Sequence, residues 1–248
     1  MAISSTGSIS MSTIQTEFGG SNPISLSEYY RSNTYEAAVS GNNTTVPQSG
    51  TIKMSQFRGT FQARYIVWKL LGAGGGGGYG VFNGAGSGKA ADGGNSTITY
   101  NGTTYTANGG AGGDNGAIYY NQSGSAGQNA DTSQGYSENF GTSGVESPQQ
   151  TNGAAGTGFA AGGSGAGGDN PDQYDSSGNK GEGGLAGSEQ TQTDYVAVGG
   201  SIVYDLGVGG AGGDSSFDGA AGLSGLVVIN SNGSEVVRTG TDGTYTVV

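Results

Sequence analysis

The chain has 248 residues, of which 55 are glycine, 4 are proline and none is cysteine or histidine. A collagen-like fibre is excluded because there is no sustained Gly-X-Y period and almost no proline. Without cysteine and histidine the chain has no disulfide, no thiol nucleophile and no imidazole base or metal ligand. The net charge is −11, and most acidic residues follow residue 70. This acidic body would repel a phosphate backbone, so we expect no nucleic-acid partner.

The glycine content alone would fit a disordered chain, but 14 tyrosines, 7 phenylalanines and several valine and isoleucine runs argue for order. No N-terminal stretch has the basic start and apolar run of a signal peptide, and no segment approaches a transmembrane span. We therefore expect an ordered, mainly β protein without membrane insertion. If it acts outside a cell, release by lysis inside an assembled virus particle is one route.

A short pattern occurs three times in the first sixty residues: Ile, any residue, Met or Leu, Ser, any residue, and a large apolar group. The copies begin at Ile9, Ile24 and Ile52. The serine of the pattern can cap a short helix, with the apolar residue before it packing on the first turn. The pattern predicts a small module of short helical turns and extended segments over residues 1–60. So small a module is marginal alone, and we expect it to pack on a partner. The residues proposed for this assembly interface are Ile24, Leu26, Tyr29, Ile52, Met54 and Phe57.

Strand signals dominate the rest of the chain. Residues 61–71 give the strongest, and 96–100 and 103–106 flank Asn101-Gly102, which favours a two-residue hairpin turn. Later strands are predicted at 195–198, 201–206, 226–230, 235–239 and 245–248, with Asn232-Gly233 and Asp242-Gly243 as turns.

Glycine clusters separate these strands, at 72–78, 109–113, 153–168, 181–187 and 207–213. Ordering glycine costs more backbone entropy than ordering any other residue, and glycine has no side chain to bury in return. The compensation we expect is close backbone packing of polyglycine-II helices, which have three residues per turn, with long loops leaving the ends of the stack. Residues 61–248 are thus predicted to form a glycine-rich β domain.

Several motifs fail as signs of chemistry. Residues 72–77 match G-x-G-x-x-G after a strand, but no helical period follows. Gly88-Lys89 lacks both the earlier glycine and the following Ser or Thr of a phosphate loop. Carboxylates show no distinctive spacing. We expect no enzyme activity, no catalytic residue and no cofactor.

Calcium remains an alternative. Gly-Gly-Ala-Gly-Gly-Asp occurs at 109–114 and 209–214, and a partial copy ends at Asp169. This approaches the calcium-binding β-roll repeat, but those sites need tandem copies. We therefore predict no metal site; if one exists, its oxygen ligands would be Asp114, Asp169 and Asp214.

Aromatic residues lie in polar stretches beside the glycine clusters. Tyr-, Ser-, Gly- and Asn-rich loops on a rigid frame resemble the composition of binding paratopes. In the other interpretation these rings cover the glycine stack as its hydrophobic cap, and both roles stay open. The receptor-binding candidates are Tyr79, Phe82, Tyr119, Tyr120, Tyr136, Phe140 and Tyr174.

Two parts of the chain resemble tail proteins of tailed bacteriophages. Residues 8–30, with Ile-Ser-Met-Ser-Thr-Ile and Ile-Ser-Leu-Ser-Glu-Tyr-Tyr, and 52–59, with Ile-Lys-Met-Ser-Gln-Phe-Arg-Gly, are similar to a module of phage virion proteins. Residues 64–80 and 206–229 resemble phage glycine-rich tail domains, which open with a strand reaching Trp68 and close with Gly-Leu-Val-Val-Ile. The resemblance implies an adhesin at a fibre tip that binds a host receptor through loops between glycine motifs.

The sequence hypothesis is a virion tail protein, of the fibre or tip, at the particle surface. Its expected partners are other virion tail proteins, bound through the N-terminal module, and a host-surface receptor, and we expect a homo-oligomer. The first alternative is a purely structural subunit of a virion or of an extracellular bacterial filament. A calcium-stabilised secreted matrix protein is the second.

Overall fold

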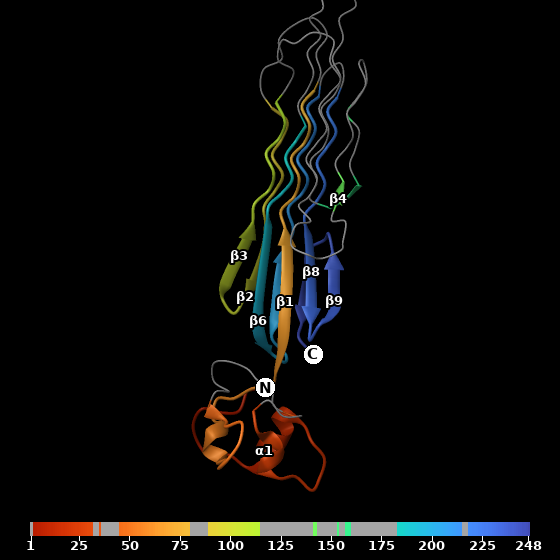
Figure 1. The fold of residues 1–248 in the computed structure, drawn as a ribbon. Coiled ribbons are helices and arrows are strands. Elements are labelled where there is room, and N and C mark those ends of the chain that lie inside the picture. The colour runs from red at the N-terminus through yellow and green to blue at the C-terminus, as the bar shows by residue number, and fades with distance from the viewer. Residues whose placement is uncertain are drawn as a thin grey trace, which may run out of the picture.

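The structure is a computed structural model, and it describes residues 2–31, 35, 45–79, 89–114, 141–142, 153, 157–159, 183–214 and 218–248. Three parts follow one another along its length (Figure 1): the N-terminal module, a pair of β-sheets and a stack of glycine-rich segments. Both ends of the described chain lie near the junction between the module and the sheets.

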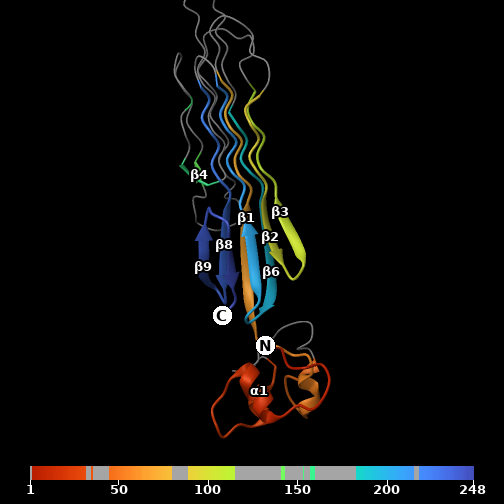
Figure 2. The ribbon, with the colours of Figure 1, turned by 180° about the vertical axis from the view of Figure 1, so that it is seen from behind.

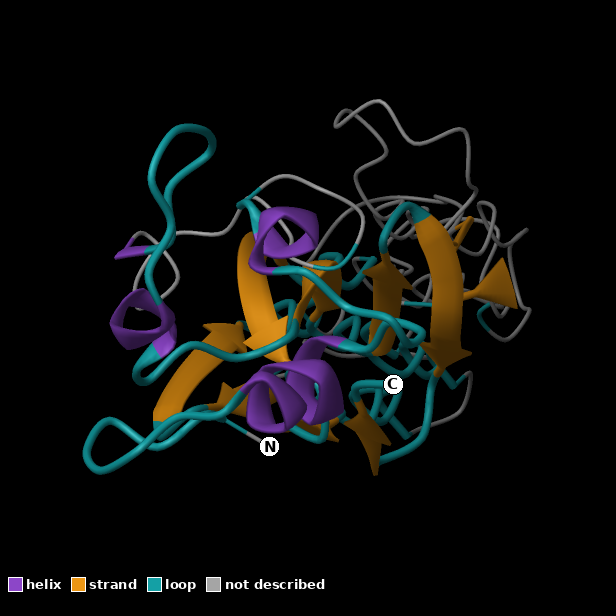
Figure 3. Ribbon diagram, turned by 90° about the horizontal axis from the view of Figure 1, so that it is seen from below, coloured by secondary structure: helices purple, strands orange, loops and turns teal. Residues whose placement is uncertain are grey.

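Short helices, seen from below in Figure 3, shape the N-terminal module. Those that lie wholly within the described residues are α1 (Met11–Phe18) and the 3-10 helices η1 (Leu26–Tyr29) and η3 (Met54–Phe57). Each begins within one copy of the repeated pattern, as predicted. The capping position was wrong by two residues, because the N-cap residues are Ser10, Ser25 and Lys53 and the serine of the pattern lies in the first turn.

The module has its own aromatic core. The rings of Phe18, Tyr29 and Phe57 lie 6.2–6.4 Å apart in all three pairs. Ile3, Ile14 and Val46 complete the buried cluster. Each helix thus contributes one ring to a shared centre, which is how so small a module builds a core.

One test of the capping arrangement is Ser25→Ala. The Ser25 hydroxyl accepts from the backbone N–H of Ser27 at 3.2 Å, and Glu28 accepts from the N–H of Ser25 at 3.1 Å. We expect the substitution to lower the free energy of unfolding by about 1 kcal/mol. Ser55→Ala, at an exposed first-turn position, is the control. Equal unfolding midpoints for the two variants in urea would contradict the capping role.

The β part consists of two four-stranded antiparallel sheets. The first has the order β6-β1-β8-β9 and the second β10-β7-β2-β3, and both are seen from behind in Figure 2. A third sheet pairs the two-residue strands β4 (Gly141–Thr142) and β5 (Thr157–Gly158). The strands of the main sheets are β1 (Ala63–Leu71), β2 (Ser96–Tyr100), β3 (Thr103–Ala107), β6 (Glu189–Ala197), β7 (Ser201–Asp205), β8 (Leu226–Ser231), β9 (Ser234–Thr239) and β10 (Gly243–Thr246).

The hydrophobic core lies between the two main sheets. Alternate residues of β1 point into it, and Trp68 at its middle is fully buried. Its ring makes edge contacts with Tyr100 and Tyr105 of the opposite sheet, at centroid distances of 6.1 and 5.6 Å. Ile98 and Ile202, which also belong to that opposite sheet, lie in the same buried cluster as Trp68. The period-two burial is what an antiparallel sandwich requires.

The predicted strands are confirmed, with clear differences at β10 and β6. At β10 the prediction of a turn at Asp242-Gly243 and a strand at 245–248 was wrong, because the strand begins at Gly243, which pairs with Tyr204 of β7, and ends at Thr246. The hairpin at Asn101-Gly102 forms as expected, with both residues at positive φ. The sequence predicts a strand from 195, whereas β6 begins at Glu189. Residues 189–194 are polar and carry no apolar alternation, but they pair with residues 66–71 of β1. Glu189 also forms an ion pair of 2.8 Å with the buried Lys69.

Candidate receptor-binding end and its glycine frame

The segment 72–77 continues directly from β1 and lies at the centre of the glycine stack. Its backbone N–H groups donate to three neighbouring segments in turn, and the order of neighbours repeats at every third residue. The N–H groups of residues 72 to 77 donate, at 2.8–3.0 Å, to the carbonyl oxygens of Ser188, Gly94, Leu223, Leu185, Ala91 and Ala220. Three residues per turn and bonds only to neighbouring segments make this a polyglycine-II arrangement.

The carbonyl groups of the same segment accept from two further segments. Ala73 and Gly76 accept from residues 110 and 113, and Gly74 and Gly77 accept from residues 210 and 213, all at 2.8–2.9 Å. Five described segments therefore surround the central one. Along the central segment, the residue numbers of the accepting partners decrease, so the three accepting segments run antiparallel to it. The residue numbers of the donating partners increase, so the two donating segments run parallel to it.

Close approach of the backbones explains the glycine content. A Cβ atom on Gly75 would lie 2.1 Å from the carbonyl oxygen of Ala111, and one on Gly76 would lie 2.0 Å from that of Ala211. No side chain can be accommodated at such distances from the main chain. Residues 72–78 are all buried. The expectation of backbone packing in place of side-chain packing is thus met by the described glycine segments.

The direction of the segments decides where their connections lie. Segments 72–79, 108–114 and 206–214 leave β1, β3 and β7 and run away from the N-terminal module. Segments 89–95, 183–188 and 218–225 return to β2, β6 and β8. The connections 80–88, 115–182 and 215–217 therefore start and finish at the end of the stack opposite the module. We call this end the distal end.

Side chains satisfy the backbone where the stack reaches solvent. The N–H of Gly109 donates to Asn95 Oδ1 at 2.9 Å, and that of Gly112 donates to Asp92 Oδ1 at 2.8 Å. Lys89 Nζ also donates to Asp92 Oδ1, at 2.6 Å. This side-chain bond with Lys89 and the bond with Gly112 hold the pKa of Asp92 below its usual 3.8. Sequence reasoning did not assign this role to Asp92 or Asn95, although the two residues flank Gly93-Gly94 in the sequence.

The Asp92 carboxylate gives a pH-dependent prediction. A carboxyl group whose folded-state pKa is lowered stabilises the fold above its unfolded pKa, and that contribution is lost as the pH falls through the folded pKa. We expect wild-type stability to drop as the pH falls from about 5 to below 3.8, and Asp92→Asn to reduce this dependence. Urea midpoints across this range measure it, with Asp205→Asn on β7 as the control. Identical pH profiles for wild type and Asp92→Asn would contradict the role.

Of the receptor-binding candidates, the structure describes only Tyr79. Its half-buried side chain lies at the distal end of the central segment. The other candidates lie outside the described residues: Phe82, Tyr119, Tyr120, Tyr136, Phe140 and Tyr174. The structure therefore brings one candidate, Tyr79, to the distal end, and it does not test the others.

The calcium alternative gains no support from the described part of the chain. Asp114 and Asp214 are exposed, Asp169 lies outside the described residues, and no group of three acidic side chains within the described ranges could hold a metal ion. Within the same ranges no helix is long and apolar enough to span a membrane.

The assembly-interface candidates lie in and around the core of the N-terminal module. Tyr29 and Phe57 are fully buried in this core. The remaining four, Ile24, Leu26, Ile52 and Met54, are half-buried and pack against it. Only these four present apolar surface to a partner in this conformation.

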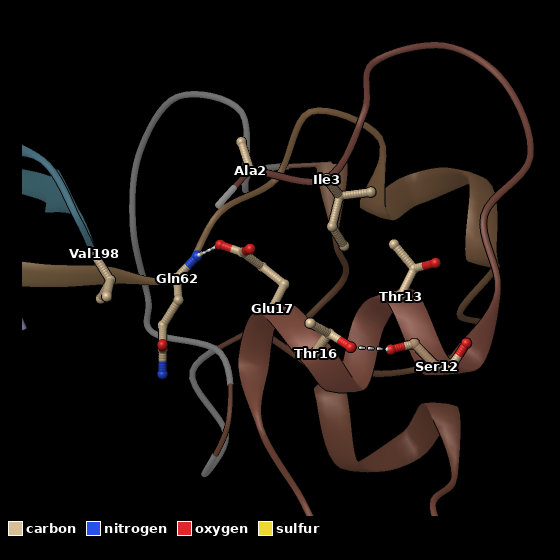
Figure 4. Close-up of a pocket in the computed structure, with 8 residues that line it drawn as sticks. All are labelled: Ala2, Ile3, Ser12, Thr13, Thr16, Glu17, Gln62 and Val198. Atoms are coloured by element: carbon tan, nitrogen blue, oxygen red, sulfur yellow. Dashed lines mark hydrogen bonds between the residues drawn. The ribbon is translucent and has the colours of Figure 1, made fainter.

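A pocket of about 420 Å³ lies at the junction of the module and the sheets (Figure 4). One wall is a face of α1 that carries Ser12, Thr13, Thr16 and Glu17, and the opposite wall has Gln62 and Val198. Ala2 and Ile3 close one side. Sequence reasoning did not find this pocket, because its walls come from distant parts of the chain.

The chain has no match among protein-family models, curated proteins or solved structures.

Proposed function

We propose that this chain is a structural protein of a virion tail, at the fibre or tip, that displays host-recognition loops on its glycine frame. It acts by binding and performs no chemistry. The observation that carries the proposal is the common position of the three connections 80–88, 115–182 and 215–217, which all join the frame at the distal end. The N-terminal module at the opposite end is then placed for attachment to other tail proteins.

The composition of the connections supports this assignment. They hold Tyr119, Tyr120, Tyr136 and other aromatic residues among Ser, Gly and Asn. Tyrosine gives a large contact area at low conformational-entropy cost, and a rigid frame lowers the entropy of binding further. The frame itself is held by backbone bonds, so its described bonds do not use these rings.

Adsorption of whole virions tests the proposal. We expect a Tyr119→Ala/Tyr120→Ala double variant to slow adsorption to host cells at least about tenfold, as loss of two binding anchors would. Incorporation into particles and the melting temperature should stay unchanged. Tyr65→Ala, on the outer face of β1 and 40% exposed, is the matched control. Normal adsorption by the double variant would refute receptor binding through these rings.

One observation favours the alternative of a purely structural subunit. Phe159, which belongs to the segment between Asp114 and Gly183, is half-buried against Leu71, Leu226 and Val228. This ring serves as cover for the outer face of the first sheet. If every aromatic residue of the connections did the same, the double variant would lower stability or particle assembly and leave the adsorption of the assembled particles normal.

Cryo-EM of the native tail would give the number of copies of this chain, for which we expect more than one.

A further inference from the structure

Three Asn-Gly dipeptides lie wholly within the described residues, and they differ in how their reactive groups are held. They begin at Asn101, Asn108 and Asn232. In such a dipeptide the glycine nitrogen can attack the asparagine amide, because glycine has no side chain to hinder the approach. The attack needs a glycine backbone nitrogen without a partner and an asparagine side chain that can rotate toward it. The state of these two groups therefore ranks the three sites.

At Asn101 both groups are free of partners in the described part of the chain. Asn101 and Gly102 form the exposed turn between β2 and β3, at the end of the second sheet nearest the N-terminal module (Figure 1). The Asn101 amide and the Gly102 N–H bond to no atom of the described residues. A Cβ atom built on Gly102 would meet nothing within 4 Å. The amide therefore has room to rotate onto the glycine nitrogen.

Asn108 is held in the glycine stack. The N–H of Gly109, which would be the attacking nitrogen, donates to Asn95 Oδ1 at 2.9 Å. The Asn108 N–H donates to Ser188 Oγ at 2.7 Å, and its carbonyl accepts from the Ser188 N–H at 2.8 Å. A Cβ atom on Gly109 would lie 1.8 Å from the Gly93 carbonyl oxygen, so the backbones are in close contact. Reaction at this site requires the segments to separate.

Asn232 has the same turn conformation as Asn101, but its side chain is bonded. Its φ is +49°, against +48° at Asn101. Asn232 Oδ1 accepts from the Tyr65 N–H at 3.0 Å, and the Asn232 N–H donates to the Tyr65 carbonyl at 2.8 Å. Rotation of the amide toward Gly233 would break the first of these bonds. Asn232 is therefore the matched comparison for Asn101.

We propose that Asn101 is a site of spontaneous deamidation and that its conversion loosens the core between the two sheets. The Gly102 nitrogen attacks Cγ of Asn101 and forms a new N–C bond. The side-chain nitrogen leaves as ammonia with the proton that Gly102 has lost, and a cyclic succinimide remains. Water then adds to either carbonyl carbon of the ring and opens it to aspartate or isoaspartate. Isoaspartate adds a methylene group to the main chain, which the two-residue turn cannot accommodate.

The consequence for the core comes from the two tyrosines on either side of the turn. Tyr100 ends β2 and Tyr105 lies on β3, and their rings contact Trp68 at centroid distances of 6.1 and 5.6 Å. The turn sets the register of β2 with β3, in which Tyr105 pairs with Ile98. An added methylene group in the turn displaces β3 against β2 and moves the rings off Trp68.

Ageing of the full-length protein tests the site. The protein is incubated at neutral pH, sampled over weeks and analysed by peptide mapping with mass spectrometry, which resolves amide, aspartate and isoaspartate at each position. We expect Asn101 to convert at least about tenfold faster than Asn108 and Asn232, because reaction at those two waits for local opening. Conversion of Asn232 at the rate of Asn101, or no conversion of Asn101, would overturn the assignment.

Asn101→Gly tests the link to the core. A Gly-Gly pair favours the same turn and has no amide to lose, so this variant should fold as wild type does and keep its melting temperature on ageing. We expect the aged wild-type fraction that carries isoaspartate to melt at least about 2 °C below the fresh protein. An unchanged melting temperature in that fraction, or an equal loss in aged Asn101→Gly, would overturn the link. Neither measurement depends on adsorption or on incorporation into virions.

Discussion

Gly76→Ala is expected to destabilise the glycine frame by about 3 kcal/mol or more, the upper range for overpacking of a close-packed interior. The added methyl carbon would lie 2.0 Å from the carbonyl oxygen of Ala211 and 2.8 Å from that of Gly210. Both atoms belong to the main chain of a neighbouring segment, so no rotamer change can relieve the contact. Relief requires the segments to separate, which breaks the bonds on both sides of residue 76.

Thermal and urea unfolding measured by circular dichroism give the size of this effect. Gly102→Ala is the matched control, because its φ is +75° and no atom lies within 4 Å of the added Cβ. This control carries the backbone strain of an alanine at positive φ, about 1 kcal/mol, without a clash. If Gly76→Ala cost no more than Gly102→Ala, the close packing of the segments would be contradicted.

Trp68→Ala is expected to lower the free energy of unfolding by about 3–5 kcal/mol, as removal of a fully buried aromatic residue does. Trp68 is 0% exposed and contacts aromatic rings of the opposite sheet. Its loss leaves a cavity at the place where the two sheets meet. Since the central glycine segment continues from the same strand, we expect the frame to lose stability with the sandwich.

Two controls separate burial from other contributions at this strand. Tyr65→Ala, on the same strand but 40% exposed, should cost about 1 kcal/mol or less. Trp68→Phe should cost less than Trp68→Ala, since the indole N–H has no hydrogen-bond partner among the described residues and only volume is lost. A small effect of Trp68→Ala in chemical denaturation would contradict the sandwich core described above.

Local chemistry made some features predictable from sequence. Asn101-Gly102 forms the expected turn because both residues readily adopt positive φ, at +48° and +75°. The strongest strand signal, at 61–71, correctly predicted β1 at Ala63–Leu71. The start of β6 was not predictable in this way, since residues 189–194 form a strand through pairing with β1 and not through their own pattern.

Long-range features were less accessible. Glycine clusters predicted close backbone packing, but a glycine carries no side-chain pattern that could specify its neighbours. The neighbours are set by the strand that each segment continues, so they follow from the sheet order. The pocket had no sequence signal at all, because Glu17 and Gln62 lie 45 residues apart and meet only after the module has packed on the sheets.

The distal position of the connections has an evolutionary consequence. Most described bonds that hold the frame join main-chain atoms, and doubling the length of a closed loop costs only about 0.6 kcal/mol. Residues 141–159 include Phe159, which covers the first sheet, and are excepted from this tolerance. Insertions, deletions or recombination within residues 80–88, 115–140, 160–182 and 215–217 can therefore be inherited without rebuilding the frame. On the proposed function, a lineage could change its host by exchanging these stretches, and related chains should vary most there and least at the glycines of the stack.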